Sequence, residues 1–363
     1  MARSLGSGGT ERQLMEIARA LSRDRFQVHV GCFDKGIRAE ELERAGIPIL
    51  QLPVRSFMRP AAFLSAWQLI RYIRKHKIQI VHTFDYPLNC FGVPVARLAG
   101  TRAVLSSQRA HRELTPAPYW MILRVTDRLV KGIVVNSESV RREMIARERV
   151  PAELLHLCYN GIDTRNFKPG GRTRRPELAE AALVIGVVCV LRPEKGLPTL
   201  LIAFASFEKL HPGARLVIVG SGPELASLQA LAGELQIYGK VRFEPATVHV
   251  SDWLRSIDIF VLPSLSEALS NALMEAMACG CACIASRTGG NPELLDSDEV
   301  GLLYEPGNAS ELTEKLTLLA GDPLLRKRYA QGAIQKIETK FSLAASAKCM
   351  QEIYAKTLAN STH

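Results

Sequence analysis

Short apolar runs alternate with helical patterns along both halves of the chain, and this alternation constrains the fold more than any other feature. In the second half, the fully apolar residues 183–190 (LVIGVVCV) precede a helical segment, and residues 214–220 and 259–262 begin the same pattern again. Strands joined through helices pair in parallel, because a parallel connection needs a crossover of a dozen residues or more. The sequence therefore predicts an α/β protein with doubly wound parallel sheets.

The length of the chain suggests two such sheets. It has 363 residues, and domains usually contain roughly 150. Residues 156–176 combine an Asn-Gly turn with a proline-, glycine- and arginine-rich stretch without periodicity, which is typical of a linker. We therefore expect one domain in residues 1–166 and a second in residues 167–340. Because only five residues precede the glycine-rich loop at Gly6, we also expect the first strand of the first domain to be missing.

Positive charge is concentrated in the first domain. Residues 1–170 contain 27 Lys and Arg against 15 Asp and Glu, whereas residues 171–363 contain 19 against 21. A basic surface attracts an anionic partner, which could be a nucleic acid, a phosphorylated sugar or an acidic lipid headgroup. The plain alternative is a solvated surface that only aids solubility. A nucleic-acid partner is disfavoured, because the basic residues lack interleaved aromatic residues.

The cysteines and the apolar runs indicate a cytoplasmic location. The eight cysteines are mostly scattered and are interpreted as reduced thiols. The cluster Cys279, Cys281 and Cys283 lacks the CxxC turns of a metal site, so no metal is expected there. The longest apolar run, residues 182–191, is about half of the roughly 20 residues needed to cross a bilayer. The start of the sequence also has no signal-peptide hydrophobic region.

Two glutamates, Glu267 and Glu275, stand at a fixed spacing around a predicted strand-to-helix connection. Residues 259–262 (IFVL) are typical of a buried strand, and residues 271–278 (NALMEAMA) are typical of a helix that Ser270 or Asn271 would cap. Glu267 then lies in the loop at the carboxyl end of a strand, and Glu275 lies inside the helix. In open α/β sheets this edge is where ligands bind.

Other polar groups are predicted at the same edge of the second domain. Arg192 and Lys195 follow one strand, and a glycine-rich loop at Gly220–Gly222 follows another. A third turn, residues 288–293 (TGGNPE), would present amides at a helix start capped by Asn291. Cations and amides suit a diphosphate, and carboxylates accept hydrogen bonds from sugar hydroxyls. The combination indicates a nucleotide-sugar site.

The first domain contributes weaker candidates. Gly8 and Gly9 precede a predicted helix capped by Thr10, and glycines there let backbone amides approach an anion. Polar side chains also end two predicted strands of this domain, where a pocket for an acceptor would form, although lone residues of these types are more often structural. These acceptor-side candidates are His82, Gln108, Arg109 and His111.

Six short motifs occur in a characteristic order along nearly the whole chain. They are GSGGTER, YNGIDTRNF, LRPEKG, VGSGPELASL, the E-x7-E element EALSNALME, and TGGNPELL. Together they resemble the retaining glycosyltransferases of family 4, which have the GT-B fold of two Rossmann-like doubly wound domains facing each other across a cleft. The resemblance implies that the final helix, residues 341–363, packs back on the first domain.

The resemblance also implies roles for single residues. Arg192 and Lys195 match the pair that grips the donor diphosphate and stabilises the leaving nucleoside diphosphate, in place of a metal. Glu275 matches the residue that accepts hydrogen bonds from the donor ribose, and Glu267 the one that contacts the transferred sugar. The remaining expected donor contacts are the backbone amides of Leu269, Ser270 and Asn271, the loop at Gly222, and Gly8 and Gly9 from the other domain.

The expected activity is a metal-independent retaining transfer of a hexose-type sugar from a UDP- or GDP-sugar to a lipid-linked or polysaccharide acceptor. Front-face attack is favoured over a carboxylate nucleophile. No cofactor and no nucleic-acid partner are expected, and the basic first domain would let a cytoplasmic enzyme sit peripherally on the inner membrane face. The alternatives are a non-catalytic sugar- or lipid-binding scaffold and a nucleotide-sugar epimerase or phosphorylase of the same fold. One departure from the family pattern is Glu244-Pro245-Ala246, where a glycine is common.

Overall fold

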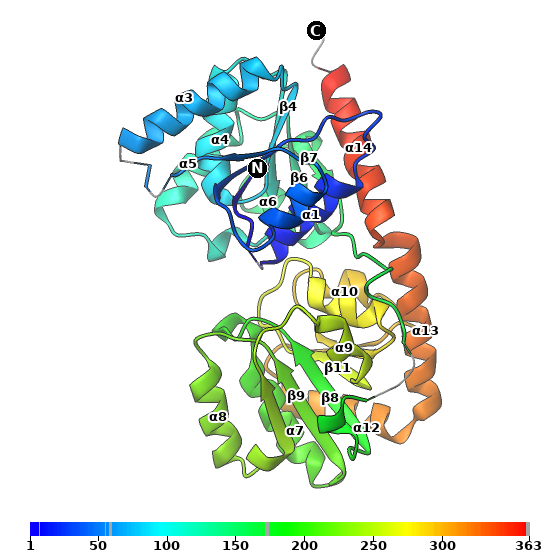
Figure 1. Cartoon of the computed structure of the whole chain (residues 1–363). Helices are drawn as coiled ribbons and strands as arrows, with labels where there is room; N and C mark the ends of the chain where they lie inside the picture. Colours follow the sequence, from blue (N-terminus) through cyan, green and yellow to red (C-terminus); the bar gives the residue numbers. More distant parts are fainter. Residues whose placement is uncertain (7, 55, 58–59, 171–173, 361–363) are drawn as a thin grey trace. The chain divides into compact units, whose positions relative to one another are not determined.

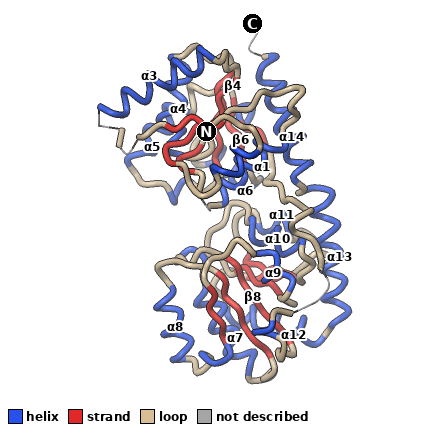
Figure 2. The backbone as a smooth tube through the Cα atoms, in the orientation of Figure 1, coloured by secondary structure: helices blue, strands red, loops and turns tan. Residues whose placement is uncertain are grey.

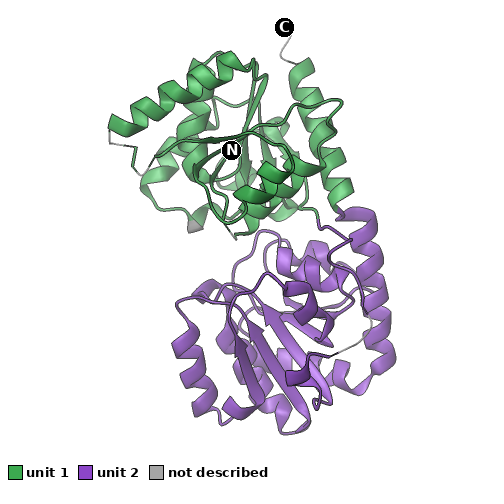
Figure 3. Cartoon of the chain, in the orientation of Figure 1, with its two compact units in different colours: residues 1–161, 343–363 green, residues 162–342 purple. Residues whose placement is uncertain are grey.

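The computed structural model describes residues 1–6, 8–54, 56–57, 60–170 and 174–360. It divides into two compact units (Figure 3). Unit 1 comprises Met1–Gly161 and Leu343–His363, and unit 2 comprises Ile162–Ser342. The predicted linker lies where the chain passes from unit 1 to unit 2, although its residues 171–173 are outside the described part.

Unit 1 is built from parallel strands with helices between them (Figures 1 and 2). Its strands form two ladders, ordered β1-β2-β3 and β4-β5-β6-β7. The strands are β1 (Ala2–Ser4), β2 (Val30–Asp34), β3 (Ile49–Gln51), β4 (Ile80–Thr83), β5 (Ala103–Gln108), β6 (Gly132–Val135) and β7 (Leu155–Leu157). The helices are α1 (Gly9–Ala20), α2 (Ala39–Arg44), α3 (Pro60–Lys75), α4 (Tyr86–Leu98), α5 (Pro118–Thr126), α6 (Glu138–Ala146) and α14 (Leu343–Ala359).

Strand β1 is present, so the prediction that the first strand is missing was wrong. Ala2 pairs with Cys32 and Ser4 with Asp34 in a parallel ladder. The strand is hidden in the sequence because it has only three residues, two of them polar, and Ala2 alone among them is buried. Next to it, a cavity of about 500 Å³ opens between residues 27–31 and 78–82. The next strand, β2, begins at Val30.

Helix α14 completes unit 1. It packs against α1, and Met350, Ile353 and Tyr354 join the apolar core formed by β1, β2 and α1. At the chain passages between the units, Ile162 pairs with Ser342 as an isolated parallel bridge. The two passages of chain therefore lie side by side.

Unit 2 has a single six-stranded parallel sheet, ordered β10-β9-β8-β11-β12-β13. The order reverses between β8 and β11, which makes that position the topological switch point of the sheet. The strands are β8 (Leu183–Val188), β9 (Ala214–Val219), β10 (Val241–Glu244), β11 (Ile259–Leu262), β12 (Ala282–Ser286) and β13 (Leu302–Tyr304). The helices are α7 (Leu197–Glu208), α8 (Leu225–Glu234), α9 (Val250–Arg255), α10 (Asn271–Ala278), α11 (Asn291–Leu294), α12 (Ala309–Gly321) and α13 (Pro323–Lys340).

The core of unit 2 lies between its sheet and the covering helices. Phe204 and Phe207 of α7 pack with Ile185, Ile259 and Tyr304 from three strands, all of them fully buried. These strands are apolar on both faces because helices cover both faces of a parallel sheet. The sequence pattern is therefore explained by burial.

Three further features bear on the expected cellular location and metal content: the state of the cysteines, clusters of metal-binding side chains, and the apolar character of the helices. The eight cysteines of the chain are free thiols, and Cys279, Cys281 and Cys283 are buried. Among the described residues, no three or more His, Cys, Asp and Glu side chains gather in a way that could hold a metal ion. Within the same residues, none of the helices combines the length and the apolar character needed to cross a membrane.

Candidate active site

The candidate site of unit 2 lies at the switch point, where the loops after β8 and β11 meet. The backbone N–H of Leu265 donates to the Glu194 carbonyl oxygen at 2.8 Å, and that of Ser266 donates to the same oxygen at 3.4 Å. Because β8 and β11 are adjacent and parallel, their carboxyl ends bring these two loops to one edge. The two predicted groups of donor-binding residues are thus neighbours.

Gly196 permits the close approach of these loops. It has φ +60°, in the left-handed region, and a Cβ there would lie 2.2 Å from the Pro263 carbonyl oxygen. Glycine is the residue that adopts this φ at little cost. The glycine of the RPEKG motif therefore holds the shape of the site, a role that the sequence reasoning did not assign to it.

Lys195 and Glu267 form an ion pair at this edge. The Lys195 Nζ donates to the Glu267 Oε2 at 2.6 Å, and the two side chains are 20% and 13% exposed. The Ser264 Oγ donates to the same carboxylate oxygen at 3.3 Å. Burial alone would lower the pKa of Lys195, but the charge and hydrogen bond of Glu267 outweigh it and raise that pKa above its ordinary value. Lys195 is therefore a fixed cation at neutral pH.

Arg192 lies on the same loop in a more open setting. Its side chain is 60% exposed and makes only a loose ion pair with Glu194, 3.9 Å from Nη1 to Oε1. A guanidinium in this position keeps most of its donors available for a planar or tetrahedral anion. The structure thus places one half-buried and one exposed cation on a single loop.

Helix α10 carries the second glutamate. The Ser270 Oγ accepts a hydrogen bond from the Leu273 N–H at 3.2 Å, so Ser270 is the cap and Asn271 is the first helical residue. Leu269 and Ser270 are buried. Glu275 is only 4% exposed, which excludes a helix-surface charge. A buried carboxylate is retained where donors meet it, since desolvation otherwise disfavours its charged form.

The glycine-rich loop after β9 packs against the loop after β8. A Cβ on Gly222 would lie 2.2 Å from the Leu191 carbonyl oxygen, and one on Gly220 would lie 1.8 Å from that of Cys189. Leu191 also donates to the Ser221 carbonyl at 3.0 Å, and Glu224 donates to the Leu191 carbonyl at 3.2 Å. Backbone packing thus accounts for these glycines, while a contact of Gly222 with a donor stays a prediction.

The turn at residues 288–293 corrects one prediction. Asn291 does not cap α11, because Gly290 occupies the cap position and Asn291 is the first helical residue. The fully buried Asn291 side chain instead donates through Nδ2 to the Ser286 carbonyl at 3.0 Å. The Thr288 Oγ1 donates to the Leu265 carbonyl at 3.3 Å. The turn is therefore tied to the Glu267 loop.

Two serines missed by the sequence reasoning support the same edge. Ser286 is the last residue of β12 and Ser264 follows β11 by two residues, and both are fully buried. The Ser286 Oγ donates to the Ser264 carbonyl at 2.5 Å. A polar residue at the end of each apolar strand was the available signal.

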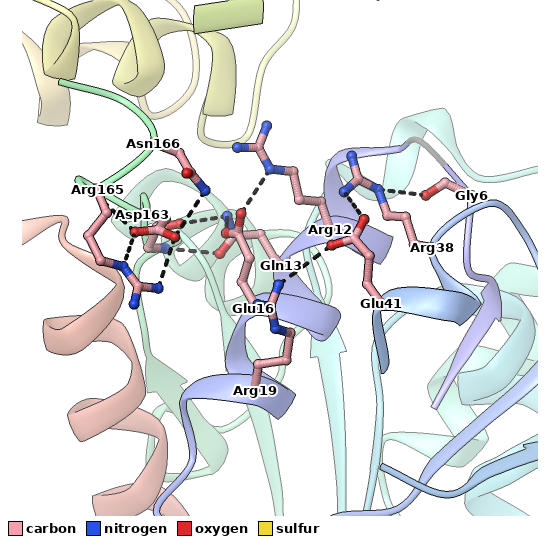
Figure 4. Close-up of polar contacts among 11 residues, drawn as sticks. Gly6, Arg12, Gln13, Glu16, Arg19, Arg38, Glu41, Asp163, Arg165 and Asn166 are labelled. Atoms are coloured by element: carbon pink, nitrogen blue, oxygen red, sulfur yellow. Dashed lines mark hydrogen bonds and ion pairs between the residues drawn. The ribbon is translucent and has the colours of Figure 1, made fainter. Parts of the chain in front are cut away.

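The glycine loop of unit 1 differs from expectation at its helix start. Helix α1 begins at Gly9 with Gly8 as its cap residue, so the prediction that Thr10 caps it was wrong. The Glu11 carboxylate occupies the space beside Gly8, since a Cβ there would lie 2.2 Å from Glu11 Oε2. The Arg38 Nε donates to the Gly6 carbonyl at 3.1 Å (Figure 4). Both charges stand near the predicted phosphate contact of Gly8 and Gly9, which stays a prediction.

Gln13 was not singled out in the sequence, yet it fixes the YNGID motif. Its Nε2 donates to the Gly161 carbonyl at 2.9 Å, and its Oε1 accepts from the Gly161 N–H at 2.9 Å. The side chain is 1% exposed. The amide therefore acts as a reciprocal clamp between α1 and the end of unit 1.

Of the four acceptor-side candidates, His82 is the most enclosed. Its Nδ1 is 2.8 Å from the Tyr354 Oη and its Nε2 is 2.8 Å from the Ser107 Oγ. Burial, reinforced by the positive charge of Arg109, holds the pKa of His82 well below its ordinary value. His82 is thus a neutral residue inside unit 1.

The other three candidates also have partners within unit 1. The Gln108 Nε2 donates to the Ala110 carbonyl at 2.5 Å, and the His111 Nδ1 contacts the Glu143 carboxylate. Arg109 donates to the Asn160 Oδ1, and burial lowers the pKa of its guanidinium to about 10. The structure brings them to the ends of β5 and the following turn, and their roles toward an acceptor stay predictions.

The buried Arg112 was also missed. Its Nη2 donates to the Asp127 Oδ2 at 2.6 Å, and its Nη1 to the Glu148 Oε2 at 3.3 Å. Burial raises the pKa of Asp127, and the Arg112 charge opposes that rise. This network joins the turn after β5 to the end of α5.

Comparison with known proteins assigns the family. The description "Glycosyltransferase Family 4" matches residues 7–166, and "Glycosyl transferases group 1" matches residues 173–336. The chain is 27% identical over 319 residues to the sulfoquinovosyl transferase of Arabidopsis thaliana, covering 82% of this chain and 61% of the relative. It is 29% identical over 309 residues to the GDP-mannose-dependent alpha-(1-6)-phosphatidylinositol monomannoside mannosyltransferase of Mycobacterium tuberculosis H37Rv, covering 80% and 77%.

Solved structures agree on the fold. The chain superposes with a TM-score of 0.86 on HepE from Anabaena in complex with UDP and glucose, at 21% identity and over 98% of each chain. With sucrose-phosphate synthase from Thermosynechococcus elongatus the TM-score is 0.79, at 19% identity, over 99% of this chain and all of that one. Two Rossmann-like parallel-sheet units and these neighbours define the GT-B fold. The chain belongs to the family 4, group 1 glycosyltransferases.

Proposed function

We propose that this glycosyltransferase moves a hexose-type sugar from a UDP- or GDP-sugar to a lipid-linked or polysaccharide acceptor, with retention of configuration and without a metal. The nucleotide choices follow the similar proteins, since HepE is described with UDP and the mycobacterial relative as GDP-mannose-dependent. That relative also acts on a phosphatidylinositol monomannoside, which favours a lipid-linked acceptor.

The ion pair between Lys195 and Glu267 is the observation that carries the proposal. At 2.6 Å, it fixes a cation beside a carboxylate at the switch point of the sheet. An ammonium there would stabilise negative charge on the departing diphosphate, and the exposed Arg192 would add bidentate hydrogen bonds. The two cations take the part that a metal plays in other nucleotide-sugar enzymes.

In this proposal the two glutamates contact different parts of the donor. Glu267, on the loop, contacts the hydroxyls of the transferred sugar and stabilises positive charge that develops on its ring. Glu275, buried in α10 next to the capped start of the helix, accepts hydrogen bonds from the ribose. The backbone amides of Leu269, Ser270 and Asn271, at and just before the start of α10, suit the phosphates, because a helix start favours an anion.

The proposed chemistry is front-face attack. The bond between the anomeric carbon and the β-phosphate oxygen breaks, and its electron pair stays on that oxygen. The acceptor hydroxyl forms the new bond on the same face, and its proton passes to the departing phosphate. The carboxylate of Glu267 remains an ionic partner throughout and forms no bond to the sugar.

A calorimetric screen tests the donor. UDP, GDP and ADP are titrated into the chain, each with its glucose or mannose conjugate where one exists, and we expect one base to bind at least tenfold more tightly than the others. The anomeric configuration of the transferred sugar, read by NMR after incubation with the preferred donor and a lipid extract, then tests retention. An inverted product would refute the front-face mechanism. No binding of any nucleoside diphosphate would refute the site itself and favour the scaffold alternative.

A further inference from the structure

Helices α3 and α5 of unit 1 carry large apolar side chains on their outer faces. On α3, Phe63, Leu64 and Trp67 are 75%, 70% and 58% exposed, although Ala62, Ser65, Leu69 and Ile73 already supply a buried face. A helix of a soluble domain usually has one apolar stripe, directed to the core. The second stripe on α3 needs another explanation.

Helix α5 repeats the arrangement. Met121 and Val125 are 74% and 55% exposed, and Trp120 and Ile122 are about 40% exposed. Helix α4 contacts both α3 and α5, so the three helices lie together on one flank of unit 1 (Figure 1). We call the exposed apolar side chains of α3 and α5 the outer apolar surface. Exposed apolar side chains gathered on neighbouring helices indicate a binding site more often than scattered ones do.

Aromatic contacts hold the two helices in place beneath this surface. Phe57, which precedes α3, stacks on Phe91 of α4 at 6.1 Å and meets Tyr119 of α5 edge-on at 6.4 Å. The Trp120 Nε1 donates to the Thr115 carbonyl at 2.9 Å, so its indole is fixed. The outer apolar surface is therefore presented by an ordered frame.

Positive charge predominates in the segment that contains α3 and its neighbours. Residues 45–112 contain ten Lys and Arg but a single acidic residue, Asp85. That carboxylate is engaged by the backbone N–H groups of Arg3 and Leu88. Exposed Arg71, Arg74 and Lys75 follow the apolar residues on α3, and the Arg71 guanidinium lies 4.6 Å above the Trp67 ring.

Exposed positive charge also lies beside the apolar residues of α5. Arg124 and Arg128 are exposed there. The acidic residues that flank the helix are paired, Glu113 with Arg147 and Asp127 with the buried Arg112. Arg124 also forms a loose ion pair with Glu148 at 3.5 Å, and Arg112 shares that carboxylate. Cations therefore outnumber acids along the border of the outer apolar surface.

We propose that the outer apolar surface of α3 and α5 docks unit 1 on an anionic lipid bilayer. Tryptophan and phenylalanine sit well at the headgroup level of a bilayer, where their rings are buried, and adjacent Lys and Arg contact acidic headgroups. A protein partner would have to be acidic and apolar together to fit as well. This proposal rests on the proposed function to the extent that a lipid-linked acceptor would be reached from the docked enzyme.

Vesicle sedimentation tests the docking directly. The whole chain is spun with vesicles of neutral phosphatidylcholine, or with vesicles that also contain phosphatidylglycerol, in the absence of any sugar donor. We expect sedimentation with the anionic vesicles that weakens as salt is raised. The double variant Phe63→Ser/Trp67→Ser should lower the partition coefficient at least tenfold. Reversing charge with Arg71→Glu/Lys75→Glu should lower it similarly.

Matched controls use exposed residues elsewhere. Val248→Ser and Leu324→Ser, both 80% exposed in unit 2, remove exposed apolar side chains elsewhere, and Lys209→Glu and Lys348→Glu reverse charge outside the outer apolar surface. These variants should bind vesicles like the parent chain. Circular dichroism and nucleoside diphosphate binding, measured on every variant, separate a docking defect from misfolding and from failure of the donor site.

Two results would overturn the proposal. One is equal sedimentation of the parent chain and the α3 variants with anionic vesicles. The other is a dimer, seen by light scattering, that Phe63→Ser/Trp67→Ser converts to a monomer while vesicle binding is absent, since the surface would then be an interface between two copies of the chain.

Discussion

The ammonium of Lys195 donates to the carboxylate of Glu267 across 2.6 Å, so the cation assigned to the diphosphate and the carboxylate assigned to the sugar are partners of each other. An arriving diphosphate would compete with Glu267 for Lys195. This makes the ion pair both a structural brace and a preformed part of the site, and the two roles can be separated by mutation.

Lys195→Ala should lower both stability and binding, whereas Arg192→Ala should lower binding alone. Removing Lys195 leaves the largely buried Glu267 without its cation, which we expect to cost about 1–3 kcal/mol of unfolding free energy. The Arg192 side chain is 60% exposed, so its removal should change stability little. Urea unfolding and nucleoside diphosphate calorimetry on both variants make the comparison. Equal stability of the two variants would contradict it.

Glu267→Ala and Glu275→Ala should have different effects. The first should abolish sugar transfer while nucleoside diphosphate affinity stays within a few fold, because the nucleotide does not contain the sugar that Glu267 contacts. The second should weaken nucleoside diphosphate binding roughly tenfold or more, through lost hydrogen bonds to the ribose. Calorimetry with the diphosphate is the measurement. Unchanged binding by Glu275→Ala would remove the ribose assignment, provided that its circular dichroism matches the parent chain.

Gly222→Ala and Gly233→Ala form a matched pair in one strand-to-helix segment. A Cβ on Gly222 would lie 2.2 Å from the Leu191 carbonyl oxygen, so the two loops must separate, and we expect a loss of about 1–3 kcal/mol. Gly233 lies within α8, and no neighbouring atom is within 4 Å of a Cβ there. Its replacement should stabilise the chain by about 0.5–1 kcal/mol through helix propensity. Denaturant unfolding midpoints measure the stability change of each variant. Loss of stability in both variants would contradict the prediction.

Acid should destabilise unit 1 through His82. Burial keeps the pKa of His82 well below 6.5 in the folded chain, while the unfolded chain takes up a proton near pH 6.5. The unfolded state therefore binds more protons below that pH, and stability falls as pH falls, by up to about 1.4 kcal/mol per pH unit. Unfolding at pH 7.5 and 5.5 measures this slope. His82→Gln should flatten it, and an unchanged slope in that variant would assign the acid sensitivity to other groups.

The doubly wound sheets could be predicted because the strands that build them are apolar on both faces. Residues 183–188 and 259–262 become β8 and β11, and the loops after them lie at the edge that the alternation of strands and helices indicated. The spacing of Glu267 and Glu275 likewise implied a loop carboxylate and a helical one. Local pattern and topology are enough for these features.

Contacts of single side chains were harder to predict from the sequence. Ser270 caps α10 as expected. The Asn291 side chain, however, donates to the carbonyl at the end of the preceding strand, and Gly290 is the cap residue of α11. Capping propensity alone does not say whether an asparagine side chain accepts from an N–H of the helix start or donates to a nearby carbonyl. Burial lowers the pKa of His82, and the Nδ1 of its ring meets the Oη of Tyr354, which is 272 residues away in sequence. Such contacts follow from tertiary packing and carry no local signature.

The three-residue length of β1 has a dynamic consequence. In unit 1, β1 pairs with β2 at the edge of the first ladder. Met1, just before β1, accepts on its carbonyl oxygen from the N–H of Phe84, just after β4, at 2.9 Å. Val30 and Gly31 of β2 line the cavity next to this strand. Local opening should begin along this seam, so amides of β2 should exchange with deuterium well before those of the central strand β8 in unit 2.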